Sequence, residues 1–219
     1  MIIDIIFEIF IAKEEVFMDK SRVGCIIMAS GIGKRFGGDK LMAELNGKPI
    51  IQHIIDETES LFYKRIVVTR NDLVKKLCDE RNIEVIYHEF PDRNDAIRLG
   101  VEAFEKYSPA GCIFCPADMP LILRVTLLKM LELIDNDREI ICRTIHAGNP
   151  GAPVYFGNKY FEALKILSKG KGGREIIKEN NNSVRYVEVK NEYELWDIDT
   201  REDYDKVKNK IEEITFLHQ

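Results

Sequence analysis

Short apolar runs rich in β-branched residues alternate with amphipathic segments along most of this 219-residue chain. Continuous apolar runs of this length predict buried strands, whereas apolar residues spaced three and four apart predict helices. Strands that alternate with helices form a parallel sheet covered on both faces, because right-handed crossovers connect its strands. We therefore expect an α/β fold with a doubly wound, mostly parallel sheet and helices on both faces.

The pattern is clearest in the first half of the chain. Strands are predicted there at residues 25–29, 65–69, 83–87 and 111–115, with helices at 50–61, 72–81 and 94–104. The second half predicts helices at 123–134, 159–167 and 174–178, strands at 139–144, 152–156, 184–189 and 195–198, and a glycine- and proline-rich loop at 146–153. Asn94 is the expected cap of its helix, and Thr200 with Asp203 forms a capping-box-like start for a final helix.

No linker-like stretch divides this series of elements, so residues 23–214 are predicted to form a single domain. Residues 1–22 are then an N-terminal extension, whose first part is an upstream-start artefact or an amphipathic helix, and residues 215–219 are a tail. The apolar run at residues 2–11 contains two acids and has no basic start, which argues against a secretory signal or a spanning helix. We expect a cytoplasmic protein that does not enter a membrane.

The net charge and the cysteines indicate which partners and which kinds of site to expect. The net charge is −5, with 37 acidic residues, so no nucleic-acid partner is expected. Five scattered cysteines suit free thiols in a reducing compartment. Cys112 and Cys115 form a CxxC pair, but residues three apart in a strand point to opposite faces, which favours a buried structural pair over a metal site.

The run that starts at Cys25 leads into a glycine-rich, basic loop at residues 29–40, which we interpret as a cradle for nucleotide phosphates. The nucleotide-binding candidates are Ala29, Ser30, Gly31, Gly33, Lys34, Arg35 and Lys40. The loop is no Walker A motif, because Arg35 stands where that motif needs a hydroxyl residue. It also departs from the dinucleotide fingerprint, which requires a small residue where Phe36 stands. The alternative is an ordinary glycine turn.

Two acidic sites complete the candidate chemistry. Asp118 follows the strand at 111–115, at the edge where open α/β sheets bind ligands, and Asp197 and Asp199 directly precede the final helix. If Asp118 and Asp199 share a cleft, they bind Mg²⁺ together with phosphate oxygens and water. A turn at Asp118 and an extra helix cap at Asp199 are the alternatives. Spacing does not decide between Asp197 and Asp199 as the second ligand, since both lie on one side of an extended segment.

Five motifs in this order resemble the MobA-like nucleotidyltransferases, and most resemble the molybdenum-cofactor cytidylyltransferase branch. The motifs are residues 29–40, 118–120, 148–151, 172–174 and 197–200, and the resemblance covers about residues 23–210. It implies a Rossmann-like fold of the nucleotide-diphospho-sugar transferase type. Ser30 replaces a more usual alanine, and residues 88–100 lack glycines often found in the family, which leaves the choice of nucleobase open.

The resemblance also implies an activity and roles for individual residues. Arg35 and Lys40 would contact the nucleotide phosphates, Asp118 and Asp199 would coordinate Mg²⁺, and the acceptor-side candidates are Asn149, Gly172, Gly173 and Arg174. The implied reaction transfers CMP from CTP to the phosphate of a molybdopterin-type acceptor with release of pyrophosphate, and a molybdenum hydroxylase is an implied partner. The alternatives are GTP as donor, another phosphorylated acceptor, or a non-catalytic protein that delivers cofactor to the hydroxylase.

Overall fold

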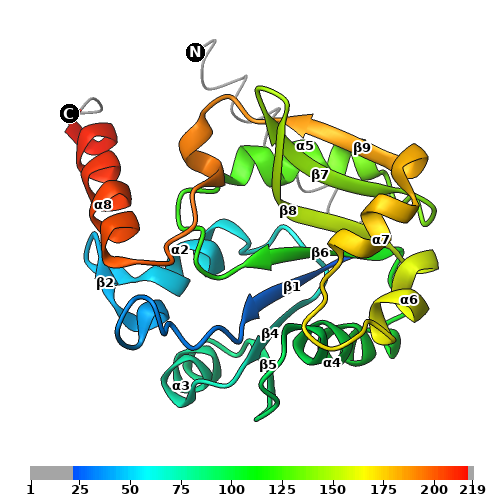
Figure 1. The fold of residues 1–219 in the computed structure, drawn as a ribbon, viewed down its shortest axis with the longest axis horizontal. Coiled ribbons are helices and arrows are strands. Elements are labelled where there is room, and N and C mark those ends of the chain that lie inside the picture. Colours follow the sequence, from blue (N-terminus) through cyan, green and yellow to red (C-terminus); the bar gives the residue numbers. More distant parts are fainter. Residues whose placement is uncertain (1–21, 217–219) are drawn as a thin grey trace.

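The computed structural model describes residues 22–216, so most of the predicted N-terminal extension and the end of the predicted tail lie outside the described residues. A seven-stranded sheet runs through the centre of the molecule in the order β5-β4-β1-β6-β8-β7-β9 (Figure 1). Its strands are β1 (Val23–Ala29), β4 (Arg65–Thr69), β5 (Glu84–Tyr87), β6 (Gly111–Pro116), β7 (Ile141–His146), β8 (Asn149–Gly157) and β9 (Val184–Glu188). Only β8 is antiparallel to its neighbours, which confirms the predicted mostly parallel sheet.

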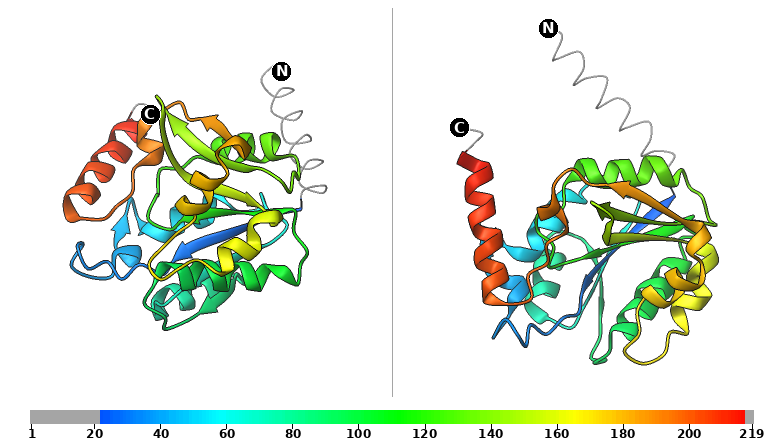
Figure 2. Two further views of the ribbon diagram at one scale, coloured as in Figure 1. Left: turned by 45° about the vertical axis from the view of Figure 1, so that its right-hand side comes forward. Right: turned by 45° about the horizontal axis from the view of Figure 1, so that its top comes forward.

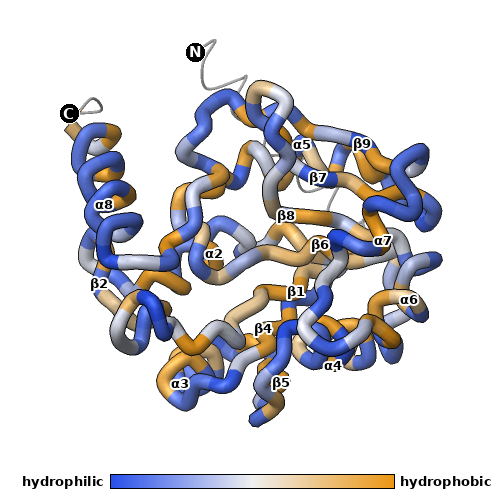
Figure 3. The backbone as a smooth tube through the Cα atoms, viewed as in Figure 1, coloured by the Kyte–Doolittle hydropathy of each residue, from blue (hydrophilic) through white to orange (hydrophobic). Residues whose placement is uncertain are grey.

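Helices cover both faces of the sheet (Figures 1 and 2). They are α2 (Ile50–Glu57), α3 (Asp72–Glu80), α4 (Arg93–Glu105), α5 (Arg124–Ile134), α6 (Phe161–Lys165), α7 (Arg174–Glu179) and α8 (Arg201–Phe216). Apolar residues of α2, α3, α5 and α8 pack with one face of the sheet, and those of α4, α6 and α7 pack with the other. The strands accordingly form the apolar centre of the molecule, whereas the outer faces of the helices are hydrophilic (Figure 3). Among residues 22–216, no helix combines the length and the apolar composition that crossing a membrane requires.

The two cysteines of the CxxC pair lie on opposite faces, as the strand periodicity predicts. Cys112 packs among the residues under α4, whereas Cys115 packs on the other face, with its sulfur 3.8 Å from that of Cys25. All five cysteines are buried and free. The CxxC pair is therefore a structural part of the core.

The predicted loop at residues 146–153 is instead a tight hairpin. Strand β7 ends at His146 and β8 begins at Asn149, and the two residues between them, Ala147 and Gly148, both have positive φ angles of 46° and 82°. Positive φ at both central residues gives a turn whose twist suits a two-residue hairpin. Pro150 is tolerated in β8 because pairing with β6 begins only at Val154, so its missing N–H leaves no gap in that ladder.

The predicted strand at residues 195–198 is also wrong. Residues Glu192–Leu195 form a 3-10 turn. The segment that follows is extended but belongs neither to the seven-stranded sheet nor to the small sheet of β2 (Glu44–Leu45) and β3 (Lys48–Pro49). The cap predicted at Asn94 is wrong too, since Asp92 precedes α4 and the Asn94 side chain accepts a hydrogen bond from Gly170 N at 2.9 Å. The capping box is confirmed: Asp203 N donates to Thr200 Oγ1, and Thr200 N donates to Asp203 Oδ2.

Candidate active site

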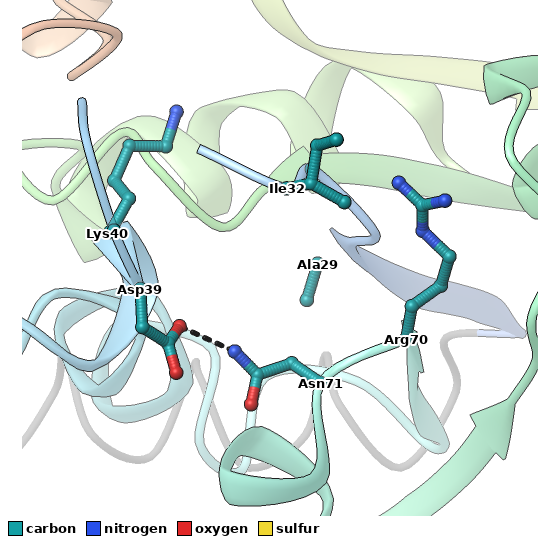
Figure 4. A pocket seen from close by; sticks show the side chains of 8 residues that line it. Ala29, Ile32, Asp39, Lys40, Arg70 and Asn71 are labelled. Carbon is teal, nitrogen blue, oxygen red and sulfur yellow. Dashed lines mark hydrogen bonds between the residues drawn. The ribbon is translucent and has the colours of Figure 1, made fainter. Parts of the chain in front are cut away.

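The strand order places a ligand site at the carboxyl end of β1. The chain passes from β1 to β4 on one side and returns to β6 on the other, so the direction of strand addition reverses there. Open α/β sheets bind ligands at such a switch point. A pocket of about 290 Å³ lies there, lined by Ala29, Gly31, Ile32, Gly38, Asp39, Lys40, Arg70 and Asn71. Figure 4 shows Asp39 and Lys40 on one side of the pocket and Arg70 on the other.

The glycine-rich loop brings backbone donors to this pocket. Gly33 has a φ of +60°, and a Cβ at this position would lie 2.5 Å from the carbonyl oxygen of Gly38, so the turn requires glycine. Within residues 22–216, the backbone N–H groups of Gly31, Ile32 and Gly33 have no hydrogen-bond acceptor. Successive N–H groups of this kind form a concave site for an anion.

Four of the predicted site residues meet beside the loop. The Lys40 Nζ lies 2.7 Å from Asp118 Oδ2 and 3.3 Å from Asp199 Oδ1, and Arg35 Nη2 lies 2.6 Å from Asp199 Oδ2. Lys40 is 6% exposed, whereas the side chain of Arg35 is 71% exposed. We call these four residues the carboxylate–cation cluster. The fold thus joins the glycine loop to two acids from distant parts of the chain.

Backbone contacts fix both acids in place. Ala117 N donates to Met28 O at 3.1 Å, which holds the segment after β6 against the end of β1. Ile198 N donates to Asp118 O at 2.9 Å, so the two acidic segments lie side by side. Asp199 N also donates to the carboxylate of the capping residue Asp203 at 3.1 Å. The helix cap therefore sets the position of Asp199 directly, although this acid lies two residues before the start of α8.

Asp197 lies near the carboxylate–cation cluster without joining it. Partial desolvation, together with repulsion from the carboxylates of Asp118 and Asp199, raises the pKa of Asp197. No ion pair links Asp197 to Lys40 or Arg35 in the described part of the chain, although both cations contact Asp199. The geometry therefore favours Asp199 over Asp197 as the partner of Asp118.

The donor set fits a hard divalent cation. One ammonium group contacts both Asp118 and Asp199, so the two carboxylates are close enough to share a single cation. Carboxylate oxygens are the ligands that Mg²⁺ prefers, and Mg²⁺ commonly uses one or two carboxylates together with phosphate oxygens and water. In residues 22–216, no group of three or more Asp, Glu, His or Cys residues could form an all-protein cage. The protein side of the site thus suits an ion that is bound together with a phosphorylated ligand.

Several residues at the pocket were not expected from the sequence. Asn71 donates to the carboxylate of Asp39 across the pocket (Figure 4), and Arg70 Nε donates to Ser30 O at 3.0 Å. His88 is 6% exposed and its Nε2 lies 2.8 Å from Ser30 Oγ. Burial and the nearby Arg70 guanidinium lower the pKa of His88, which favours the neutral form of this ring. The position of Arg70 in the sequence could have indicated its place at the pocket, because Arg70 directly follows β4, the strand beside β1.

The remaining predicted residues lie outside the carboxylate–cation cluster. Ala29 is buried at the end of β1, and the exposed Lys34 contacts neither Asp118 nor Asp199. Asn149 begins β8 at the turn of the β7–β8 hairpin, paired with His146. Gly172 and Gly173 precede α7, and Arg174 is its first residue. No contact joins these acceptor-side candidates to the cluster among the described residues.

Helix α8 holds the glycine loop from outside. It lies at one side of the molecule, beside β2 (Glu44–Leu45) (Figures 1 and 2). Phe36, 2% exposed, lies under Arg201, whose guanidinium is 3.9 Å from the ring centroid and whose Nε donates to Phe36 O at 3.1 Å. Tyr204 packs edge-on against the same ring and donates to Glu44 O. Because Phe36 adjoins Arg35, these contacts fix the cationic part of the loop.

Replacement of Arg201 should loosen the loop more than the fold. Arg201→Ala removes one exposed cation–π contact and one hydrogen bond, for which we expect about 1 kcal/mol of lost unfolding free energy in denaturant titrations. Binding of a nucleoside triphosphate should weaken several-fold, because the loop is no longer held in one conformation. Lys210→Ala is the matched control. Lys210 lies on the same helix as Arg201, but its ammonium contacts the ring of Tyr193, away from the glycine loop. Equal losses of nucleotide binding in both variants would contradict the assigned role.

Comparison with known proteins identifies the family of this chain. Residues 25–184 match the model of the MobA-like NTP transferase domain. The chain is 30% identical over 119 residues to a probable molybdenum cofactor guanylyltransferase from Pyrococcus horikoshii, which covers 53% of this chain and 58% of that protein. It is 25% identical over 199 residues to the molybdenum cofactor cytidylyltransferase of Escherichia coli, which covers 89% of this chain and 100% of that protein. The chain spans little more than half the length of the first curated relatives that it matches.

A solved structure shows the same architecture. The crystal structure of Rv0371c from Mycobacterium tuberculosis H37Rv superposes with a TM-score of 0.77 at 19% identity, covering 85% of this chain and 98% of that chain. At this identity the likeness speaks for the fold alone. It confirms the expected fold class.

Proposed function

Because this chain belongs to the MobA-like NTP transferase family, we propose that it transfers a nucleoside monophosphate from a nucleoside triphosphate to an acceptor phosphate and releases pyrophosphate. The carboxylate–cation cluster carries this proposal. It places two cations and two carboxylates beside free loop N–H groups, which is the set of charges that a triphosphate with a divalent cation requires.

The loop and its cations would bind and orient the triphosphate. The N–H groups of Gly31 to Gly33 donate to phosphate oxygens, and Arg35 and Lys40 neutralise charge that develops on the leaving pyrophosphate. Asp118 and Asp199 would hold Mg²⁺. When bound, such an ion withdraws charge from phosphate oxygens and neutralises the site. Since Lys40 contacts both acids, its ammonium would exchange carboxylate contacts for phosphate contacts as the nucleotide enters.

The attacking group would need no protein base. In the proposed reaction an acceptor phosphate oxygen forms a bond to the α-phosphorus while the bond to the pyrophosphate oxygen breaks, in line with it. A phosphate monoester is already anionic near neutral pH. The described histidines fit this scheme, because His53, His88 and His146 hydrogen-bond to Leu45 O, Ser30 Oγ and Val189 O and to no carboxylate.

We further propose that the acceptor is molybdopterin and that the donor is CTP. The molybdopterin proposal rests on the relatives, whose names describe molybdenum cofactor nucleotidyltransferases. We favour CTP because the Escherichia coli relative, which aligns with this chain over its whole length, is named a cytidylyltransferase. GTP is the second candidate, because the Pyrococcus horikoshii relative is a probable guanylyltransferase of higher identity.

The experiment is pyrophosphate release from CTP, GTP, ATP and UTP, each with and without molybdopterin, in Mg²⁺ and in chelator. We expect release with CTP that depends on molybdopterin and stops in chelator. Release with GTP alone would move the proposal to guanylyl transfer. Binding of molybdopterin with no release from any triphosphate would instead identify a delivery protein for a molybdenum hydroxylase and would overturn the enzymatic proposal.

A further inference from the structure

Arg143, in the middle of β7, is a half-buried cation without a counter-ion. Its Nε and Nη2 donate to a single backbone acceptor, Gly151 O, at 3.3 and 3.2 Å. Within residues 22–216, no carboxylate oxygen lies within 4 Å of its guanidinium. Burial, and repulsion from the neighbouring Arg174, lower the pKa of Arg143. A buried charge is costly unless it is paired, and a guanidinium has donors beyond those that one carbonyl can accept.

Two more arginines flank the loop that leads into α7. Arg174 begins α7, and Arg93 begins α4 with its side chain against Gly172, where an added Cβ would lie 3.5 Å from the Arg93 Nε. Both side chains are exposed, and neither makes an ion pair or a side-chain hydrogen bond with any residue of the described chain. Arg174 thus lies close enough to Arg143 to repel its charge, and Arg93 lies against the loop two residues before Arg174. Among residues 22–216, none of the three arginines has a carboxylate partner.

Nearby acids do not neutralise this group, because each faces a lysine. Asp92 lies 3.7 Å from Lys169 Nζ, and Glu175 lies 3.9 Å from Lys171 Nζ. The loop that carries these lysines is held on the start of α4 by the hydrogen bond from Gly170 N to the Asn94 side chain, and Figures 1 and 2 show it passing from α6 over α4 to α7. The surroundings therefore leave the arginine group positively charged.

The sheet order relates this group to the carboxylate–cation cluster. The pocket lies between the ends of β4 and β1, Asp118 follows β6, and Arg143 stands on β7, on the far side of β8. With strands about 4.8 Å apart, β7 lies roughly 10 Å from β6. The pocket beside β1, the acid Asp118 after β6 and the arginine Arg143 on β7 thus follow one another across the sheet.

We propose that Arg93, Arg143 and Arg174 bind an anionic group of the acceptor substrate, distinct from the phosphate that attacks the nucleotide. This proposal rests on the proposed function, since it assigns the far end of the acceptor of that reaction. The attacking phosphate must lie at the α-phosphorus, beside Asp118, and the separation of the strands places the arginines too far away to hold the same group. The acceptor class is therefore a molecule with two anionic ends, and arginine forks bind such oxyanions by charge-assisted hydrogen bonds.

The test uses inorganic phosphate as the probe and the Nε–H NMR signals of the arginines as the readout. We expect the Arg143 and Arg174 signals of the full-length protein to shift saturably with phosphate. Arg174→Gln should lower the affinity measured at Arg143 about tenfold, which is the scale of one charge-assisted hydrogen bond, and Arg174→Lys should recover part of it. Arg185→Gln, on the exposed end of β9, is the matched control and should change nothing.

The outcomes separate this site from the proposed transfer reaction. Phosphate that shifts only the Arg35 signal, or an Arg174→Gln variant with unchanged affinity at Arg143, would overturn the arginine site. Because the Arg174 side chain makes no ion pair or hydrogen bond within residues 22–216, we expect the Arg174→Gln variant to fold, so loss of folding does not obscure this result. In the transfer assay, Arg174→Gln should raise the acceptor KM about tenfold and leave the triphosphate KM unchanged. Wild-type protein that binds phosphate at these arginines but transfers no nucleotide would overturn the proposed function and retain the anion site.

Discussion

The Asp118→Asn variant is expected to release pyrophosphate at least about a hundredfold more slowly than the wild-type protein, the scale of a lost electrostatic stabiliser. The amide keeps the shape of the side chain but removes the negative charge that faces Lys40 at 2.7 Å. Without that charge the site cannot hold a divalent cation beside the phosphates. Folding should be retained, because the contact from Ile198 N is made to the backbone oxygen of Asp118, which the substitution does not change.

Parallel variants of the second acid sharpen this test. Asp199→Asn should lose activity on the same scale, since Asp199 contacts both Lys40 and Arg35. Asp197→Asn is the matched control, because this residue carries the same charge two positions earlier and pairs with neither cation. Pyrophosphate release and melting temperature are measured on all three. Asp118→Asn with wild-type turnover would remove Asp118 from the reaction, and a large loss in Asp197→Asn alone would move the second ligand to that residue.

The sequence predicts the central sheet because its strands are buried on both faces. The apolar runs that become β1, β4 and β6 are continuous, so their length and the helical segments between them suffice to identify them. The local sequence pattern gives a wrong prediction where contacts with a distant segment of the chain decide the structure. Residues 195–198 contain strand-forming residues, yet the sheet ends at β9, and Ile198 N pairs with the loop at Asp118 instead.

The site shows the same division between local and long-range information. Glycines, cations and acids at the ends of predicted strands indicated the loop and Asp118, because the carboxyl ends of parallel strands meet at one edge. Spacing alone left Asp197 and Asp199 open, and the capping box of α8, which orients Asp199, favours one of them. Arg143 lay beyond prediction: in sequence it is one polar residue within a strand, and its missing counter-ion becomes visible only in the folded sheet, where α7 packs on the same face as β7 and β8.

The Lys40→Met variant should lose at least about a hundredfold in pyrophosphate release and at the same time bind Mn²⁺ more tightly in the absence of nucleotide. The Lys40 side chain is 6% exposed and its ammonium contacts both Asp118 and Asp199, so a divalent cation must compete with it for the same oxygens. Methionine fills a similar volume without the charge. Removal of one charge-assisted contact is expected to raise Mn²⁺ affinity about tenfold or more, measured by electron paramagnetic resonance of the free ion.

Lys34→Met is the control for this effect, because Lys34 carries the same charge on the same loop and contacts neither acid. It should leave Mn²⁺ affinity unchanged and weaken triphosphate binding only slightly. Equal Mn²⁺ affinity in Lys40→Met and wild-type protein would show that the acids bind the ion elsewhere than at the Lys40 position. Tighter Mn²⁺ binding with full activity would instead show that Lys40 merely neutralises the acids. Only loss of turnover together with tighter Mn²⁺ binding supports the proposed role of Lys40. In that role its ammonium gives up its contacts with the two carboxylates and binds the nucleotide phosphates instead.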